Sequence, residues 1–238
     1  PLINDGKVVS YKSSEYAKDM GTPERYRRVQ EDYNSGICDA KNLANKQKAI
    51  FLDRDGTINE YVGFLRKEED FRLIPGVSEA IKKINNSGYL AIVVTNQPVI
   101  ARGEVTEEEL EEIHKKMETL LGLDGAYIDD IYYCPHHPDK GFEGEIPELK
   151  IECDCRKPKT GMLEKAAREH NIDLSSSIMI GDSTLDIKMA ENAGMQSILL
   201  KTGQKGEDGK YDVSPTLIAE DLNDAINKII YKKVSKKL

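Results

Sequence analysis

From about residue 48 onward, the sequence alternates short apolar runs with longer segments in which apolar residues recur at helical spacing. The short runs have the length of buried strands, and they are Ala49–Leu52, Tyr89–Val94, Ile128–Tyr133, Ile178–Ile180 and Ser197–Leu200. Helices are predicted from about Val77 to Gly88, after Thr106, from about Gly161 to His170, around Ile187–Ala193 and from about Ile218 to Ile230. Such alternation predicts an α/β fold, a Rossmann-like doubly wound parallel sheet with helices on both faces.

Four of the predicted strands end beside side chains that can bind a metal or a phosphate group. Asp53, Thr95, Cys134 and Asp182 each lie within two residues of the end of an apolar run. Parallel strands bring their carboxyl ends to one edge of the sheet, and ligands bind at that edge in folds of this class. We therefore expect these four side chains to share one site.

The charge and composition of the chain exclude several classes of protein. Its 238 residues carry a formal net charge of −8, which argues against a nucleic-acid binder, although a local basic cluster can still hold an anionic substrate. No apolar run has the length of a membrane span, and the four cysteines suit a reducing compartment better than a disulfide framework. We expect a cytoplasmic monomer whose partner is a small molecule, with no nucleic-acid or membrane partner.

Two carboxylates stand close together at the end of the first predicted strand. Asp53 and Asp55 occupy positions i and i+2 of an extended segment and point to the same side of it. They cannot share a dry site unless a cation joins them or one of them holds a proton, and Mg²⁺ prefers such oxygen ligands. A lone Asp-x-Asp more often marks an acidic turn. Here Asp182 and Asp186 after another strand, and Thr95 after a third, favour a metal and phosphate site.

Two short motifs, CPHHP and CDCRKP, place three cysteines and two histidines in one loop, residues 134–155. Three thiolates and one imidazole make a closed tetrahedral set, which is typical of structural zinc. The predicted Zn²⁺ ligands are Cys134, His136, Cys153 and Cys155. His137 is the alternative ligand, and we favour His136 because its spacing from the first cysteine mirrors Cys-x-Cys.

The order of these motifs resembles the haloacid dehalogenase superfamily of phosphohydrolases over residues 48–230: DRDGT, a strand ending in Thr-Asn, a basic residue and GDSTLD. The resemblance implies that Asp53 is the nucleophile and forms an aspartyl-phosphate. It implies that Asp55 protonates the leaving alkoxide and then activates water. In that role Asp55 needs a raised pKa, which the neighbouring charge of Asp53 favours.

The same resemblance implies a magnesium site and a phosphate site. Mg²⁺ would be held by Asp53, Asp182 and the backbone carbonyl of Asp55. Asp186 either adds a ligand or only braces the loop that carries Asp182. The phosphoryl oxygens would lie against Thr95 and Lys157.

A narrower resemblance is to the D-glycero-D-manno-heptose 1,7-bisphosphate 7-phosphatases, which act in heptose and lipopolysaccharide biosynthesis. The matching stretches are FLDRDGTIN, TNQ followed by IARG, YYCPHHP and CDCRKPKTGM. This family has a small zinc-binding loop in place of a large cap domain. The resemblance assigns substrate contacts to Tyr61, Val62, Gly63, Phe64, Thr95, Asn96, Gln97, Arg156 and Lys157. Pro98-Val99 stands where the family has Ser-Gly, which removes a backbone donor and a flexible glycine, so we expect an altered substrate fit there.

Two other functions are weighed against this one. The histidinol-phosphate phosphatases share the zinc loop and the acidic motifs, but the stretch VGFLRKEEDFRLIPGV resembles the heptose group more closely. A decayed, non-catalytic homologue acting as a binding module is opposed by the intact acidic and basic motifs. Transfer of the phosphoryl group to an acceptor other than water stays open.

Residues 1–47 do not join the strand–helix alternation, so we divide the chain into an extension (1–47) and a phosphatase domain (48–238). The stretch YAKDMGTPERYRRV resembles the end of sugar-phosphate nucleotidyltransferases, and a helix is predicted to begin near Pro23. The resemblance implies that the phosphatase is fused to, or works with, a nucleotidyltransferase, and then prefers the α-anomer. An unrelated tail that packs on the core is the alternative.

Overall fold

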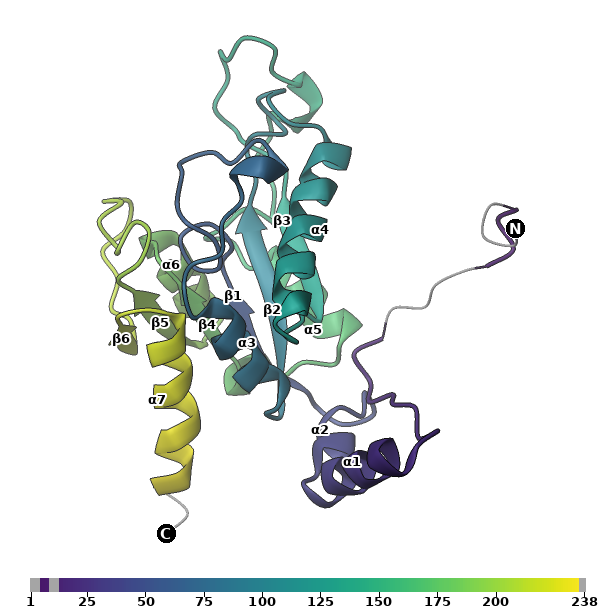
Figure 1. The fold of residues 1–238 in the computed structure, drawn as a ribbon. Coiled ribbons are helices and arrows are strands. Elements are labelled where there is room, and N and C mark those ends of the chain that lie inside the picture. The colour runs from purple at the N-terminus through teal and green to yellow at the C-terminus, as the bar shows by residue number, and fades with distance from the viewer. Residues whose placement is uncertain (1–4, 9–12, 236–238) are drawn as a thin grey trace.

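The computed structural model of the chain describes residues 5–8 and 13–235, and a six-stranded sheet forms its centre (Figure 1). The strand order is β3-β2-β1-β4-β5-β6, and every neighbouring pair is parallel. The strands are β1 (Lys48–Leu52), β2 (Tyr89–Asn96), β3 (Asp130–Cys134), β4 (Ile178–Gly181), β5 (Gln196–Leu200) and β6 (Leu217–Ala219). The predicted doubly wound parallel sheet is confirmed.

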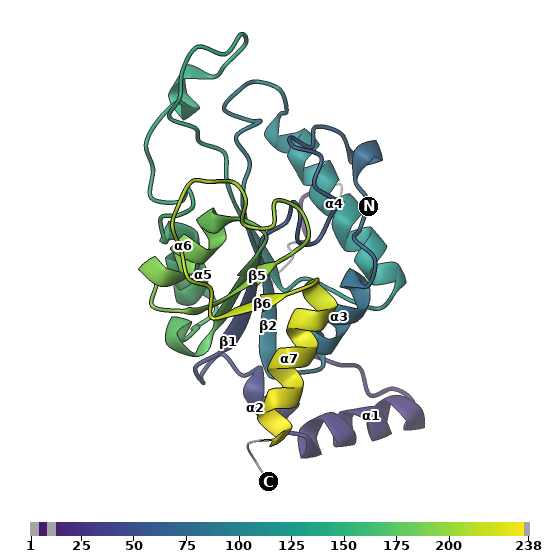
Figure 2. The same cartoon turned by 90° about the vertical axis from the view of Figure 1, so that its left-hand side faces the viewer.

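Helices cover both faces of the sheet because successive strand residues point to opposite sides. Ile50 and Leu52 of β1 face one core, whereas Ala49 and Phe51 face the other. The first core is covered by α3 (Val77–Asn85), α4 (Glu107–Leu123) and α7 (Leu222–Ser235), and the second by α5 (Gly161–Glu169) and α6 (Thr184–Asn192) (Figure 2). Among the described residues, no helix has the length and apolar character needed to cross a membrane.

The last predicted helix begins later than the sequence pattern indicates. Ile218 belongs to β6, which pairs with β5, and α7 begins only at Leu222. A three-residue apolar run is too short to display the period-2 pattern of a strand. The predicted start of this helix, at about Ile218, was therefore wrong. Three short 3-10 helices lie in the loops between these elements, namely η1 (Glu68–Asp70), η2 (Pro147–Leu149) and η3 (Leu174–Ser176).

The amino-terminal segment places its helices beyond the amino ends of the strands, at the opposite end of the molecule from the loops that follow the strands (Figure 1). It forms α1 (Pro23–Asn34), with Thr22 as its N-cap, and the short α2 (Ile37–Ala40). Ser14 Oγ lies 3.1 Å from Nδ1 of the buried His170, which ties the segment to the core. Residues 1–4 and 9–12 of the predicted extension lie outside the described residues.

Candidate active site

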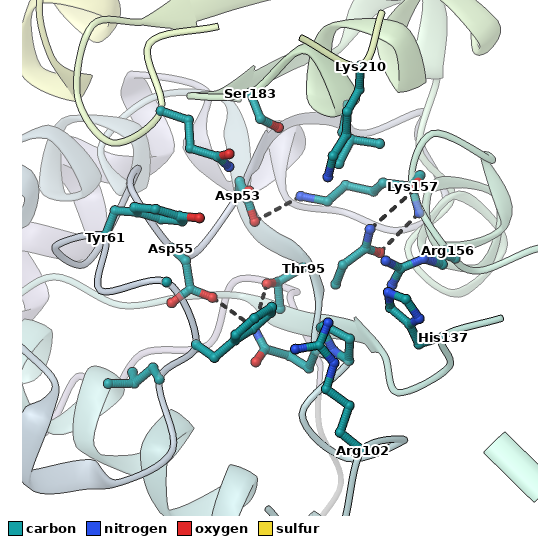
Figure 3. A pocket seen from close by; sticks show the side chains of 18 residues that line it. Asp53, Asp55, Tyr61, Thr95, Arg102, His137, Arg156, Lys157, Ser183 and Lys210 are labelled. Atoms are coloured by element: carbon teal, nitrogen blue, oxygen red, sulfur yellow. Dashed lines mark hydrogen bonds and ion pairs between the residues drawn. The ribbon is translucent and has the colours of Figure 1, made fainter. Parts of the chain in front are cut away.

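The carboxyl ends of β1, β2 and β4 and the loop before α5 surround a cavity of about 220 Å³ (Figure 3). Parallel strands bring these ends together, which is why residues far apart in the sequence meet here. Of the predicted site residues, the cavity is lined by Asp53, Asp55, Tyr61, Gly63, Phe64, Thr95, Asn96, Gln97, Arg156 and Lys157. Val62 is 52% exposed and is not among the lining residues.

Asp53 directly follows β1 and is joined to a buried lysine. Lys157 Nζ lies 2.8 Å from Asp53 Oδ1 and 2.6 Å from Asp186 Oδ1, so one ammonium bridges two carboxylates (Figure 3 draws the Asp53 pair). Burial and the charge of Asp186 raise the pKa of Asp53 to about 7, against the opposing effect of Lys157. Burial lowers the pKa of Lys157, but the two carboxylates outweigh it and raise that pKa above its ordinary value.

Asp182 gives the strongest physical indication of a metal site. The side-chain oxygens of Asp53, Asp182 and Asp186 lie within 4.8 Å of one another. Asp182 Oδ2 accepts a hydrogen bond of 2.6 Å from the backbone of Gln204, whereas Oδ1 is buried and has no partner among the described residues. Burial and the charge of Asp53 raise the pKa of Asp182 to about 8. A buried acceptor left without a donor beside two further carboxylates fits a divalent cation.

Asp186 is held by other groups as well. Its Oδ2 accepts hydrogen bonds from the backbone and hydroxyl of Ser183 and so completes the capping box of α6, while Oδ1 accepts from Lys157. Both oxygens are therefore engaged. This arrangement favours the bracing role for Asp186 over a direct place among the ligands.

Asp55 is surrounded by donors, which reverses one expectation from the sequence. Its carboxylate accepts from Arg54, from Asn59 Nδ2 at 3.0 Å and from Gln97 Nε2 at 2.9 Å. Burial raises the pKa of Asp55, but the charge of Arg54 and these hydrogen bonds outweigh it, and the net shift is downward. The expected raised pKa at Asp55 was wrong, because the sequence does not reveal how many donors the fold directs at this carboxylate.

The end of β2 supplies three predicted residues that the structure uses in different ways. Thr95 Oγ1 accepts from Gln97 Nε2 at 2.9 Å, so Gln97 links the threonine to the carboxylate of Asp55. Asn96 exchanges two hydrogen bonds with the backbone of Lys157 and thereby fixes the loop that carries it. Pro98 lines the cavity, whereas Val99 is buried in a small apolar cluster with Ile100, Val105 and Leu110.

A basic wall flanks the cavity on the side of the cysteine loop. Arg156 Nη1 donates to the backbone of His136 at 3.0 Å, and the guanidinium of Arg102 lies 4.1 Å and 4.4 Å from the ring centres of Phe64 and Phe142. Figure 3 shows the side chains of Arg102, Arg156 and His137 on this side. The arrangement can hold an anionic group at a distance from Asp53.

Several further residues line the cavity beside those predicted as substrate contacts from the sequence. These are Leu65, Pro98, Arg102, His137, Ser183, Leu185, Gln204 and Lys210. Arg102 lies in the IARG stretch and His137 beside the cysteine motif, so the matched motifs could have indicated both. Lys210 comes from a loop without a recognisable motif. Hydrogen bonds from Thr184 to the Asp208 carboxylate and from the backbone of Tyr211 to Thr184 hold that loop against α6.

The cysteine loop brings its four predicted ligands together. The sulfur of Cys155 lies 3.2 Å from that of Cys134 and 3.3 Å from that of Cys153, and His136 Nδ1 lies 3.3 Å from Cys155 Sγ. His136 is the histidine of this cluster, while His137 turns toward the cavity instead. Three sulfurs and one ring nitrogen at these separations fit a tetrahedral metal such as Zn²⁺.

Comparisons with known proteins agree with this geometry. The HAD-hydrolase-like family model matches residues 154–225. A relative from Haemophilus ducreyi named D-glycero-beta-D-manno-heptose-1,7-bisphosphate 7-phosphatase is 44% identical over 160 residues, which are 66% of this chain and 85% of the relative. A Photorhabdus laumondii relative named for the alpha anomer is also 44% identical over 160 residues, covering 67% of this chain and 85% of the relative.

Another relative and one solved structure extend the match. The Thermosynechococcus vestitus D-glycero-D-manno-heptose-1,7-bisphosphate 7-phosphatase is 38% identical over 188 residues, which are 76% of this chain and 94% of the relative. The crystal structure of the D,D-heptose 1,7-bisphosphate phosphatase from B. bronchiseptica, complexed with magnesium and phosphate, superposes with a TM-score of 0.69 at 31% identity, covering 78% of this chain and 99% of that one. The chain therefore belongs to the D-glycero-D-manno-heptose-1,7-bisphosphate 7-phosphatase family of the haloacid dehalogenase superfamily.

Proposed function

We propose that this protein is a Mg²⁺-dependent phosphatase that removes the 7-phosphate of D-glycero-D-manno-heptose 1,7-bisphosphate. The observation that carries the proposal is the group formed by Asp53, Asp182 and Lys157, in which a buried oxygen of Asp182 has no donor within the described part of the chain. It occurs in a chain whose relatives bear this name over more than four fifths of their length. The small-molecule partner is a sugar bisphosphate.

Asp53 is the nucleophile in this proposal. One of its oxygens bonds to phosphorus as the bond from phosphorus to the sugar oxygen breaks. Asp55 must hold a proton at this step, against the lowering of its pKa by Arg54, and gives that proton to the departing alkoxide. Water then attacks the phosphorus of the aspartyl-phosphate, Asp55 takes a proton from that water, and inorganic phosphate and free Asp53 are released. Lys157 and Thr95 neutralise and orient the phosphoryl oxygens.

The magnesium ion would be held by Asp53, Asp182 and the backbone carbonyl of Asp55. When bound, it supplies positive charge that screens the repulsion between the nucleophile and the phosphate. Asp186 keeps the cation Lys157 in place, and its capping of α6 fixes the loop that carries Asp182.

The second phosphate explains the remaining cations around the cavity. Arg102, Arg156 and Lys210 line it in addition to Lys157, whereas a single phosphate needs only the group around Asp53. We assign the 1-phosphate to the wall of Arg102 and Arg156, because guanidinium groups bind phosphate through paired donors. The loop from Tyr61 to Phe64 would contact the sugar between the two phosphates.

The cysteine loop would bind a structural Zn²⁺ through Cys134, His136, Cys153 and Cys155. Arg156 and Lys157 follow the last of these cysteines directly. A metal there would fix both cations, since the loop offers little apolar surface for packing. Its role is therefore to hold the substrate-binding wall rather than to take part in the reaction.

The test is phosphate release in the presence of Mg²⁺ from three substrates: the α- and β-anomers of the heptose bisphosphate and histidinol phosphate. We expect preference for a bisphosphate, and Asp53→Asn should lose nearly all turnover. Preference for the α-anomer would support a link between residues 1–47 and nucleotide-sugar synthesis. Preference for histidinol phosphate would refute the proposed substrate, and undiminished turnover by Asp53→Asn would refute the proposed nucleophile.

A further inference from the structure

The arginine between the two aspartates is the largest fully buried side chain of the described residues. Arg54 is 0% exposed, although arginine is among the residues least often buried. Its Nη2 donates to both oxygens of Asp55, at 3.0 Å and 2.8 Å, and its Nε donates to Oδ1 at 3.3 Å. A side chain of this size and charge is thus placed under the site, with its guanidinium against one carboxylate.

A buried histidine holds the other side of the same guanidinium. Nη1 of Arg54 lies 3.3 Å from Nε2 of His114, which comes from the core-facing side of α4. A guanidinium can only donate hydrogen bonds, so the facing nitrogen of His114 must accept, and the ring is neutral with its proton on Nδ1. Burial and the charge of Arg54 lower the pKa of His114 to about 3, which agrees with this assignment. The ring of Tyr133 lies beside it, at 5.9 Å between centres.

We propose that Arg54, backed by His114, is a positioning residue that holds the Asp55 carboxyl group, protonated for this step, in the orientation required for proton transfer to the leaving oxygen. The inference rests on the proposed function, in which Asp55 is the general acid and base. Arg54 transfers no proton and touches no substrate in this scheme. Its buried guanidinium is held on two sides, by the carboxyl group of Asp55 and by the ring of His114.

The remaining contacts of Asp55 make Arg54 the main support of this carboxylate. Gln97 and Asn59 donate one hydrogen bond each, whereas Arg54 donates three. Gln97 lines the cavity, so an incoming substrate can displace it, while Arg54 and His114 lie outside the lining residues. The hydrogen bonds from Arg54 to Asp55 therefore persist when substrate fills the cavity.

A comparison of two substrates distinguishes a positioning role of Arg54 and His114 from a merely structural one. An alkyl phosphate such as the heptose bisphosphate needs a proton on its leaving oxygen, whereas p-nitrophenyl phosphate releases a stable phenolate without one. The quantity to compare is kcat/KM, which covers the steps up to formation of the phosphoenzyme and so excludes the hydrolysis step that both substrates share. The decrease in kcat/KM for the bisphosphate that Asp55→Asn causes is the reference for the other variants.

The variants are His114→Leu, His114→Gln and Arg54→Lys. Arg54→Lys should lower kcat/KM for the bisphosphate by about 10²-fold and His114→Leu by about tenfold, because a displaced general acid loses part of its typical contribution. His114→Gln keeps an acceptor for Nη1 and should restore most of that activity. All three should leave p-nitrophenyl phosphate within about threefold, since no proton donor is needed there.

His170→Gln is the matched control, because His170 is also buried but lies with Ser14, near the amino-terminal segment. It should lower the melting temperature without any difference between the two substrates. Equal losses on both substrates for Arg54→Lys and His114→Leu, or no loss on either, would overturn the positioning role. A wild-type protein that hydrolyses p-nitrophenyl phosphate but not the bisphosphate would instead refute the proposed substrate.

Discussion

Replacement of Asp182 by asparagine should stabilise the magnesium-free protein while removing its response to magnesium. The side-chain oxygens of Asp53, Asp182 and Asp186 lie within 4.8 Å of one another, and one ammonium, that of Lys157, bridges two of the three. Two unit charges at that separation repel by about 3.5 kcal/mol at an effective dielectric constant of about 20. Partial protonation relieves some of this repulsion, so we expect Asp182→Asn to gain about 1–3 kcal/mol at pH 8.

The sign of the pH dependence follows from the raised pKa of Asp182. The folded protein holds this proton up to about pH 8, whereas the unfolded chain releases it near 3.8. Between these values the folded state binds more protons, so the free energy of unfolding falls as the pH rises. Asparagine cannot ionise, and the advantage of Asp182→Asn should therefore grow steadily from pH 5 to pH 8.

The assay is thermal unfolding of both proteins at pH 5 and pH 8 in magnesium-free buffer without chelator, so that the cysteine cluster is left undisturbed. Each kcal/mol corresponds to about 2–4 °C in a chain of this size. Added Mg²⁺ should raise the melting temperature of the wild type and leave that of Asp182→Asn unchanged. Asp139→Asn, at a side chain that is 77% exposed, is the control and should change neither value. A gain that is absent at pH 8, or equal at both pH values, would refute the reasoning.

Three further predictions concern the surroundings of the site. Cys153→Ala should lose about one equivalent of zinc by metal analysis, because four ligands are needed for a closed site; full retention of the metal would contradict the proposed ligand set. Arg102→Met should raise KM for the bisphosphate about tenfold through loss of a charge-assisted phosphate contact, and should change KM for p-nitrophenyl phosphate little. Equal effects on both substrates would argue for a packing role of Arg102 between Phe64 and Phe142. Removal of residues 1–45 should change kcat/KM by less than about twofold, because α1 and α2 lie at the end of the sheet away from the site (Figure 1). The melting temperature should fall. A large loss of kcat/KM in folded protein would place that segment in the catalytic unit.

The fold could be predicted because its signals are local. Apolar runs such as Tyr89–Val94 are the length of a buried strand, and the amphipathic helices between them leave few alternatives to a parallel sheet. Thr106 and Glu109 form the reciprocal capping box at the start of α4. The pattern failed at β6, where three residues are too few to show a period, and pairing with β5 decides the conformation.

The candidate site could be predicted only as a set of residues. Motif order assigned Asp53, Lys157 and the cysteine ligands to one edge, and the parallel sheet requires that edge to be shared. Lys210 and His114 carry no such signal, since one comes from an irregular loop and the other reads as part of the apolar face of α4.

The sequence by itself determined which chemical groups this protein has and the order in which the strands present them. The tertiary structure decided the state of those groups, because charge and hydrogen bonding depend on neighbours that are distant in the chain. Asp53 and Asp55 are two residues apart and look equivalent in sequence. Burial beside Asp186 raises the pKa of the first, whereas Arg54 and two amide donors lower the pKa of the second, and only the folded chain brings these neighbours into contact.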